Sequence, residues 1–233
     1  MEVQPDSPNE RADRVLHWLG LIYSGDVSGS MNAANPRVAL RIRAESPDLA
    51  AGDPYLSCAI GDENALRLAT QADPSWLNRP GGPLRLPPLF AVVHSALLRV
   101  AEFRERLHES AKFLIAAGAD VNQRIYSRWP PGSLSNPDER CPLSTLYGAA
   151  GTNRDAALTK LLLEAGADPN DGESLYHSLE NPDCTPPLAG AWRSHRRDER
   201  DLQIARPRRC GAAQAATAAW RRSKRASAKS AAE

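Results

Sequence analysis

The sequence predicts an all-α fold in which helix-turn-helix units stack into a solenoid, preceded by capping helices and followed by a poorly ordered tail. The main observation is an apolar phrase that occurs twice, at 112–122 and at 160–170, with the copies 48 residues apart. Each copy follows a shorter apolar segment that begins with proline, at 88–94 and at 142–150. Two short helices expose too much apolar surface to stand alone, and repeated units bury that surface by stacking on each other.

The N-terminal segment, residues 1–52, is expected to hold capping helices and a linker. Within 12–23, apolar residues recur at the spacing of one helix face. These residues are Val15, Leu16, Leu19 and Ile22. A second capping helix is expected at 38–44. The terminal units of a solenoid differ from the internal ones, because one of their sides has no neighbouring repeat.

The repeats are expected over residues 53–184. Two units are clear, at about 87–122 and 141–170. Two weaker units are indicated by a proline-started apolar segment with a short second helix, at 53–69, and by a single helix candidate, at 172–179. Each unit is interpreted as a first helix, a loop, a more apolar second helix and a turn.

The turn that ends each clear unit is specified by its residue types. Gly118 and Gly166 follow the apolar runs, where a helix commonly ends on a residue in the left-handed conformation that glycine adopts at low cost. Polar residues that can hydrogen-bond the local backbone of a turn come next. They are Asp120, Asn122, Asp168 and Asn170. We expect these six residues to form structural turns and no catalytic carboxylate pair.

These motifs resemble the ankyrin repeat of bacterial-type ankyrin repeat proteins, whose pattern is Thr-Pro-Leu-His-x-Ala-Ala, a leucine-rich helix, and Gly-Ala-Asp-x-Asn. The match is best at Pro142-Leu143, Ala149-Ala150 and 161–170. The threonine of the pattern is replaced by Pro87 in one unit and by Cys141 in the other. Because that replacement removes a capping hydroxyl, we expect weaker helix starts there.

The spacing of the two clear units also departs from the family, because it is longer than the usual ~33 residues. We expect the extra residues in loops, chiefly at 99–108 and 123–140. The resemblance implies a binding surface lined by the first helices of the repeats.

The C-terminal segment, residues 185–233, is rich in alanine and arginine and differs from the repeats. From Pro186 onward the formal net charge is +8, whereas the rest of the chain carries −7. Trp-Arg pairs at Trp192 and Trp220 become glycine when the codons are read one base later, and the flanking codons permit the repeat phrase. We interpret the segment as frameshift-derived or as a native disordered tail.

No catalytic or cofactor-binding constellation is found in the sequence. The five histidines lack a His-Glu-x-x-His spacing, and Gly81-Gly82 lacks the residues of a phosphate loop. His94 is expected to have a structural hydrogen-bonding role. The four scattered cysteines are typical of reduced thiols in a cytoplasmic protein, and no segment reaches the ~18 apolar residues of a membrane span. We therefore expect no enzyme, no cofactor and no metal.

The sequence predicts a monomeric, cytoplasmic module that binds another protein and does not associate with a membrane. Aromatic side chains on first helices or in the inserted loop are the expected contact residues, because such residues are common binding hot spots. They are Tyr126, Trp129, Tyr147 and Tyr176. The alternative is a nucleic-acid-associated regulator that uses the basic tail, and we regard nucleic acid as the less favoured partner.

Overall fold

The structure, a computed structural model, describes residues 8–178 and 183–198. Over these residues the fold is mainly helical, as the sequence predicts, with a single sheet of two strands. The α-helices are α1 Pro8–Ile22, α2 Gly25–Ser28, α3 Pro36–Glu45, α4 Pro54–Ile60, α5 Glu63–Ala72, α6 Pro88–His94, α7 Ala101–Ala116, α8 Thr145–Tyr147, α9 Ala156–Glu164, α10 Ser174–Ser178 and α11 Thr185–Asp198. Shorter helical turns are η1 Pro74–Asn78, η2 Ala96–Arg99 and the π-helical η3 Gly148–Asn153.

The N-terminal helices form where the apolar spacing predicts them. Trp18 and Ile22 of α1 are fully buried, and the Trp18 indole Nε1 donates to the carbonyl oxygen of Ala39 in α3 at 3.1 Å. The Tyr23 hydroxyl donates to the carbonyl oxygen of Ala91 in α6, also at 3.1 Å. These bonds connect the N-terminal helices to each other and to the centre of the molecule.

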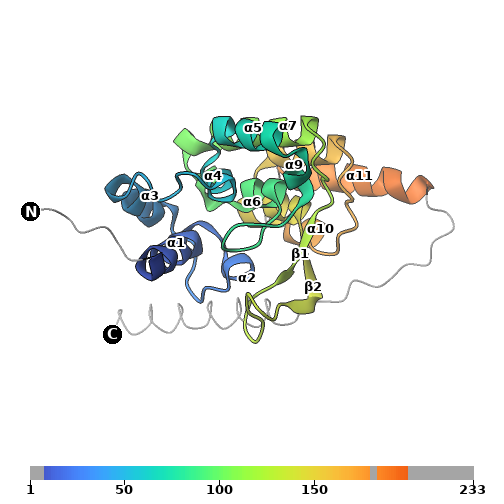
Figure 1. Ribbon diagram of the computed structural model, residues 1–233. Helices are drawn as coiled ribbons and strands as arrows, with labels where there is room; N and C mark the ends of the chain where they lie inside the picture. The colour runs from blue at the N-terminus through green and yellow to red at the C-terminus, as the bar shows by residue number, and fades with distance from the viewer. Residues whose placement is uncertain (1–7, 179–182, 199–233) are drawn as a thin grey trace, which may run out of the picture.

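The central helices lie in two layers. Helices α5, α7 and α9 form one layer, and the shorter α4 and α6 lie beneath it (Figure 1). Within the layers α4 packs on α6, α5 packs on α7, and α6 packs on η3. The resulting core is continuous from α1 to α11 and is dominated by leucine, valine and alanine.

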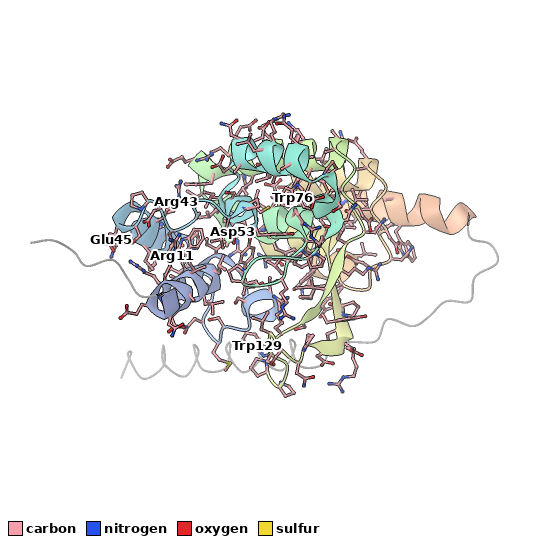
Figure 2. The ribbon with its side chains drawn as sticks, viewed as in Figure 1. Arg11, Arg43, Glu45, Asp53, Trp76 and Trp129 are labelled. Atoms are coloured by element: carbon pink, nitrogen blue, oxygen red, sulfur yellow. The ribbon has the colours of Figure 1, made fainter. Side chains whose placement is uncertain are left out.

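Local sequence explains the bounds of α4. The Asp53 carboxylate, labelled in Figure 2, accepts hydrogen bonds from the backbone N–H groups of Tyr55 and Leu56 and caps the helix. The helix ends at Gly61, which has a φ of 65°. A Cβ at Gly61 would lie 2.9 Å from the backbone nitrogen of Leu107, so glycine is required there by both conformation and space.

The predicted loop at 123–140 is wrong, because the chain forms an antiparallel hairpin there. Its strands are β1 Arg124–Ser127 and β2 Asp138–Ser144, and Tyr126 pairs with Pro142. Pro142 therefore lies in a strand and does not begin a helix. Instead α8 begins after Ser144, whose hydroxyl accepts from the backbone N–H of Tyr147 at 2.9 Å.

The loop expected at 99–108 is also wrong, because α7 begins at Ala101 and continues to Ala116. The sequence 101–111 contains few consecutive apolar residues and many charged ones. Phe103, Leu107 and Ala111 are nevertheless buried, because they lie on one face of a half-exposed helix. Pro87 provides no side-chain cap for α6, and the weaker helix start expected from that stays a prediction.

The turns at the ends of α7 and α9 have the predicted conformation. Gly118 and Gly166 lie outside the helices, with φ values of 100° and 94°. The Asp120 carboxylate accepts from the backbone N–H of Asn122, and Asp168 accepts from that of Asn170, each at 2.8 Å. The structural role of the two aspartates is confirmed, because both stabilise turns.

Asparagine side chains connect successive turns, which the sequence did not predict. Asn122 donates through Nδ2 to the carbonyl oxygen of Gly166 and accepts through Oδ1 from the backbone N–H of Asp168. Asn78, the last residue of η1, makes the same two bonds with Gly118 and Asp120. One pair of hydrogen bonds is therefore repeated along the chain.

The packed helical fold does not end at the expected boundary near Cys184. Helix α11 begins at Thr185 and packs against α9 and α10, and its Leu188 is fully buried. The expectation of a poorly ordered segment from residue 185 onward is therefore wrong for residues 185–198. Residues 199–233, which contain most of the predicted tail, lie outside the described residues.

The cysteines only partly fit the expectation of reduced thiols. Cys58 and Cys184 are buried thiols that form no disulfide. Cys141 is disulfide-bonded, so the expectation is wrong at that position. Among the described residues, no helix combines the length and apolar character needed to cross a membrane.

Candidate functional site

A row of aromatic and imidazole rings crosses three short helices, α6, α8 and α10. Phe90 stacks on His94 with ring centroids 3.8 Å apart, and His94 lies 6.1 Å from Tyr147. Tyr147 contacts His177 at 5.2 Å, and His177 contacts Tyr176 at 5.1 Å, both edge to face. The row begins in the core at Phe90 and reaches the surface at Tyr176, which is 55% exposed.

His94 is the buried end of this row and has a structural role, as the sequence predicts. Its Nε2 donates to the carbonyl oxygen of Ser144 at 2.9 Å, and this bond connects α6 to the start of α8. Burial lowers the pKa of His94 to about 4, so the ring is neutral at physiological pH. Gly148 permits the close packing, since a Cβ there would lie 2.4 Å from the imidazole ring.

Tyr147 joins the buried and exposed parts of the row. Its side chain is half-buried, and burial is the main reason that the pKa of its hydroxyl is raised. The nearby carboxylates Asp26, Glu173 and Asp171 raise the pKa further, because they oppose a second negative charge. The ring is therefore surrounded by acidic groups from two distant parts of the sequence.

Two of these carboxylates, Asp171 and Glu173, are held by local partners. Asp171 accepts hydrogen bonds from the hydroxyls of Ser144 and Ser174 and caps α10 through the backbone N–H of Ser174 at 2.8 Å. Glu173 lies 3.2 Å from Nε2 of His177. These contacts fix α10 against α8 and hold the rings in place.

Asp26 of α2 is held differently. Its Oδ1 is enclosed and has no hydrogen-bond partner among the described residues, although the side chain is only half-buried. Burial raises the pKa of Asp26, and hydrogen bonding to Ser24 and to the backbone of Asp26 and Val27 partly opposes that rise.

The hairpin brings the other predicted contact residues to a different place. Tyr126, on β1, is 45% exposed. Trp129, at the hairpin turn in Figure 2, is half-buried and packs on α2, since a Cβ added to Gly25 would lie 2.4 Å from its ring. Arg128 donates from its backbone N–H to the carbonyl oxygen of Asp26 at 2.7 Å.

The structure therefore brings Tyr147 and Tyr176 together around His177. Trp129 lies elsewhere, at the hairpin turn, and packs on α2. The sequence prediction missed Asp26 and His177. His177 had a usable signal, because it lies next to Tyr176 on an expected first helix. Asp26 had none, because its approach to Tyr147 depends on how α2 packs.

The other polar contacts of the core are structural. His108 of α7 contacts the Asp155 carboxylate at 2.9 Å, and Asp155 caps α9 through the backbone N–H of Leu158. Within the described ranges, no group of three or more histidine, cysteine, aspartate or glutamate residues could hold a metal ion.

Comparisons with known proteins identify no relative: no family model, no curated protein and no solved structure matches this chain. The function is therefore argued from the site alone.

Proposed function

We propose that this chain is an ankyrin-like repeat protein that binds another protein through the row formed by Tyr147, His177 and Tyr176. The observation that carries the proposal is this row of rings, which continues from the core to an exposed tyrosine on successive short helices. Exposed aromatic side chains held by a rigid scaffold lose little conformational entropy when they bind, and they are common hot spots.

The repeated architecture supports the proposal. The same asparagine-to-turn hydrogen bonds occur at the end of η1 and after α7, and each turn that accepts them follows a longer helix, α7 or α9. Stacked repeats of this kind present a continuous surface made from equivalent positions of successive units. Because function inferred from fold is an analogy, the binding residues themselves must be tested.

The test is affinity purification from the source cell with the full chain as bait. We expect Tyr176→Ala and Tyr147→Ala each to reduce recovery of a specific partner at least fivefold, with helical circular dichroism unchanged. Leu68→Ala is the matched control, because Leu68 is a large apolar side chain that is 66% exposed on α5, in the other helix layer. Equal recovery with all three variants would reject the proposed surface.

The sequence also favours a second candidate, a nucleic-acid-associated regulator in the cytoplasm. The observation behind it is the net charge of +8 from Pro186 onward. Contacts between basic side chains and phosphates make binding steeply dependent on salt. Binding of the full chain to duplex DNA and to RNA should therefore be measured from 50 to 200 mM salt, and absence of binding at the lowest salt would remove this candidate.

A further inference from the structure

We propose that a disulfide between Cys141 and Cys210 fastens the C-terminal segment to the hairpin, so that the uncharged run 211–220 covers an apolar groove beside α1. Two features of the described residues carry the proposal: the bonded state of Cys141 and the groove at the hairpin turn. Neither feature belongs to the row of rings that forms the proposed partner surface, so the covering of the groove and that surface are tested separately.

The first feature is the disulfide of Cys141. Cys141 lies on β2 and is disulfide-bonded, whereas Cys58 and Cys184 form no disulfide. The chain has four cysteines, and the fourth is Cys210, which lies outside the described residues. Within one chain, the bonded partner of Cys141 is therefore Cys210.

Formation of this bond is a two-electron oxidation. The two thiols lose two protons and two electrons, and glutathione disulfide, the oxidant, accepts them and becomes two molecules of glutathione. In the reduced state the Cys141 thiol still has an acceptor, because its sulfur lies 3.9 Å from a carboxylate oxygen of Asp138. The hairpin therefore accommodates both states, and reduction releases the C-terminal segment.

The second feature is a groove of about 270 Å³ between α1, the loop after α2 and the hairpin turn. Leu16 and Leu21 of α1 and Leu134 of the turn form its apolar walls, and Leu16 is 41% exposed. Met31, which is 70% exposed, follows directly on the lining residue Ser30. The described residues that line the groove include no aspartate, glutamate, lysine or arginine. An uncharged, apolar segment therefore suits this groove better than a charged one.

The groove lies within reach of the disulfide. A Cβ added to Gly132 would lie 3.3 Å from the backbone nitrogen of Asp138, so the turn that contains Leu134 folds back onto the start of β2. Cys141 follows Asp138 on the same strand, at a distance of roughly 10 Å for the usual strand rise. One hairpin therefore carries both the bonded cysteine and a wall of the groove.

The run 211–220 is the occupant that the sequence favours. It begins directly after Cys210, contains no charged residue, and consists mainly of alanine with a single large ring, Trp220. A run of this length spans about 15 Å as a helix and about 35 Å when extended, so it bridges the distance from the disulfide to the groove. Basic residues flank it on both sides, and the cost of burying their charge limits the covered stretch to this run.

The first measurement maps the disulfide in the full chain, equilibrated with glutathione disulfide. Trypsin digestion without reduction followed by mass spectrometry should give one linked pair of peptides, 141–154 with 210–221, and dithiothreitol should remove it. Cys210→Ser should abolish the pair and leave helical circular dichroism unchanged. A disulfide-linked dimer, or a Cys210 thiol that stays unlinked, would overturn the proposal.

The second measurement tests whether the segment covers the groove. With the photo-cross-linking amino acid p-benzoylphenylalanine at position 16, the oxidised chain should form cross-links to residues within 211–220. Dithiothreitol or Cys210→Ser should lower their yield at least fivefold. The matched control carries the same amino acid at position 68, because Leu68 is an exposed leucine on α5 that does not line the groove. If position 16 gives no more of these cross-links than position 68, the segment does not cover the groove and the proposal is overturned.

Discussion

At the scale of single residues, buried polar groups determine how this molecule responds to pH. His94 is fully buried between Phe90 and Gly148, and it donates one hydrogen bond to Ser144. Its Nδ1 has no partner among the described residues. Protonation would place a charge in this apolar site, so folding and protonation of His94 oppose each other.

We expect acid to destabilise the protein through His94. The pKa of the folded state is about 4, against 6.5 for an unperturbed histidine. Since the folded pKa is the lower one, the stabilising contribution is complete above pH 6.5 and is lost as the pH falls toward 4. By pH 5 the loss from this group should reach about 2 kcal/mol in the free energy of unfolding.

The measurement is urea unfolding at pH 7.5 and pH 5. The control is His94→Gln, which does not titrate and keeps a side-chain N–H for Ser144. We expect the variant to lose about 2 kcal/mol less between the two pH values than the original chain. An equal loss in both proteins would assign the acid sensitivity to other groups.

At the scale of elements, the turns are stabilised both from within and from their neighbours. Asp120 and Asp168 act inside their own turns, whereas Asn122 connects the turn after α7 to the turn after α9. The side chain of Asn122 is exposed, so each of its two bonds competes with water and contributes little on its own.

Asn122→Ala should lower the free energy of unfolding by about 1–2 kcal/mol, since it removes two hydrogen bonds between turns. Asn170→Ala is the matched control, because Asn170 occupies the equivalent position in the next turn and bonds Asp168 through its backbone N–H. We expect that change to have an effect of less than about 0.5 kcal/mol. Urea unfolding of both variants at pH 7.5 makes the comparison, and similar losses would mean that the inter-turn bonds contribute nothing measurable.

Glycine substitutions test whether α11 is a stably folded helix. Gly190 lies within α11, and a Cβ there would meet no heavy atom within 4 Å. Gly190→Ala should therefore stabilise the protein by about 0.5–1 kcal/mol, because alanine favours the helix. Gly166 has equally open surroundings but a φ of 94°, so Gly166→Ala should destabilise by about 1 kcal/mol or more. Thermal unfolding with no change for Gly190→Ala would indicate that α11 does not unfold with the rest of the protein.

At the scale of the whole molecule, the hairpin connects the N-terminal helices to the centre of the fold. Its turn contacts α2, about a hundred residues earlier in the chain, through Arg128, which donates to the carbonyl oxygen of Val27 at 2.6 Å. Burial, together with the positive charge of Arg85, lowers the pKa of Arg128 to about 10. In Figure 1 the hairpin and α2 lie side by side below α6, and the bond confirms that they touch.

Trp129→Ala should therefore act mainly on stability. We expect a loss of about 1–3 kcal/mol in the free energy of unfolding, because a half-buried aromatic ring is removed from Gly25. Tyr126→Ala, also on the hairpin but 45% exposed, should change stability by less than about 1 kcal/mol. Guanidinium unfolding distinguishes the two, and the reverse order of effects would contradict the packing of the hairpin turn on α2.

The origin of the C-terminal segment remains a prediction. Because α11 forms and buries Leu188, helical packing continues beyond Cys184. The frameshift hypothesis predicts that the coding DNA, read one base later from the codons near Cys184, stays open and encodes further repeat phrases. Stop codons in that frame would leave a native tail as the explanation.

The sequence predicted those features of the fold that depend on residues close together in the chain. The helix ends at Gly118 and Gly166 were correct, because a left-handed residue after an apolar run is a local requirement. The helix at 101–111 was missed, because its apolar residues are few and burial of Phe103 and Leu107 depends on neighbouring helices. Of the candidate site, Tyr147 and Tyr176 were identified and Asp26 was not.

The sequence by itself determined the mainly helical class, the positions of the glycine turns and the carboxylate bonds inside them, because each depends on residues close together in the chain. The tertiary structure alone decided that 124–144 is a hairpin, that Asn122 bonds a distant turn, and that Arg128 bonds the carbonyl oxygen of Val27. The physical reason is that these contacts join segments many residues apart. Their geometry follows from how the helices pack, and packing is set by the whole core.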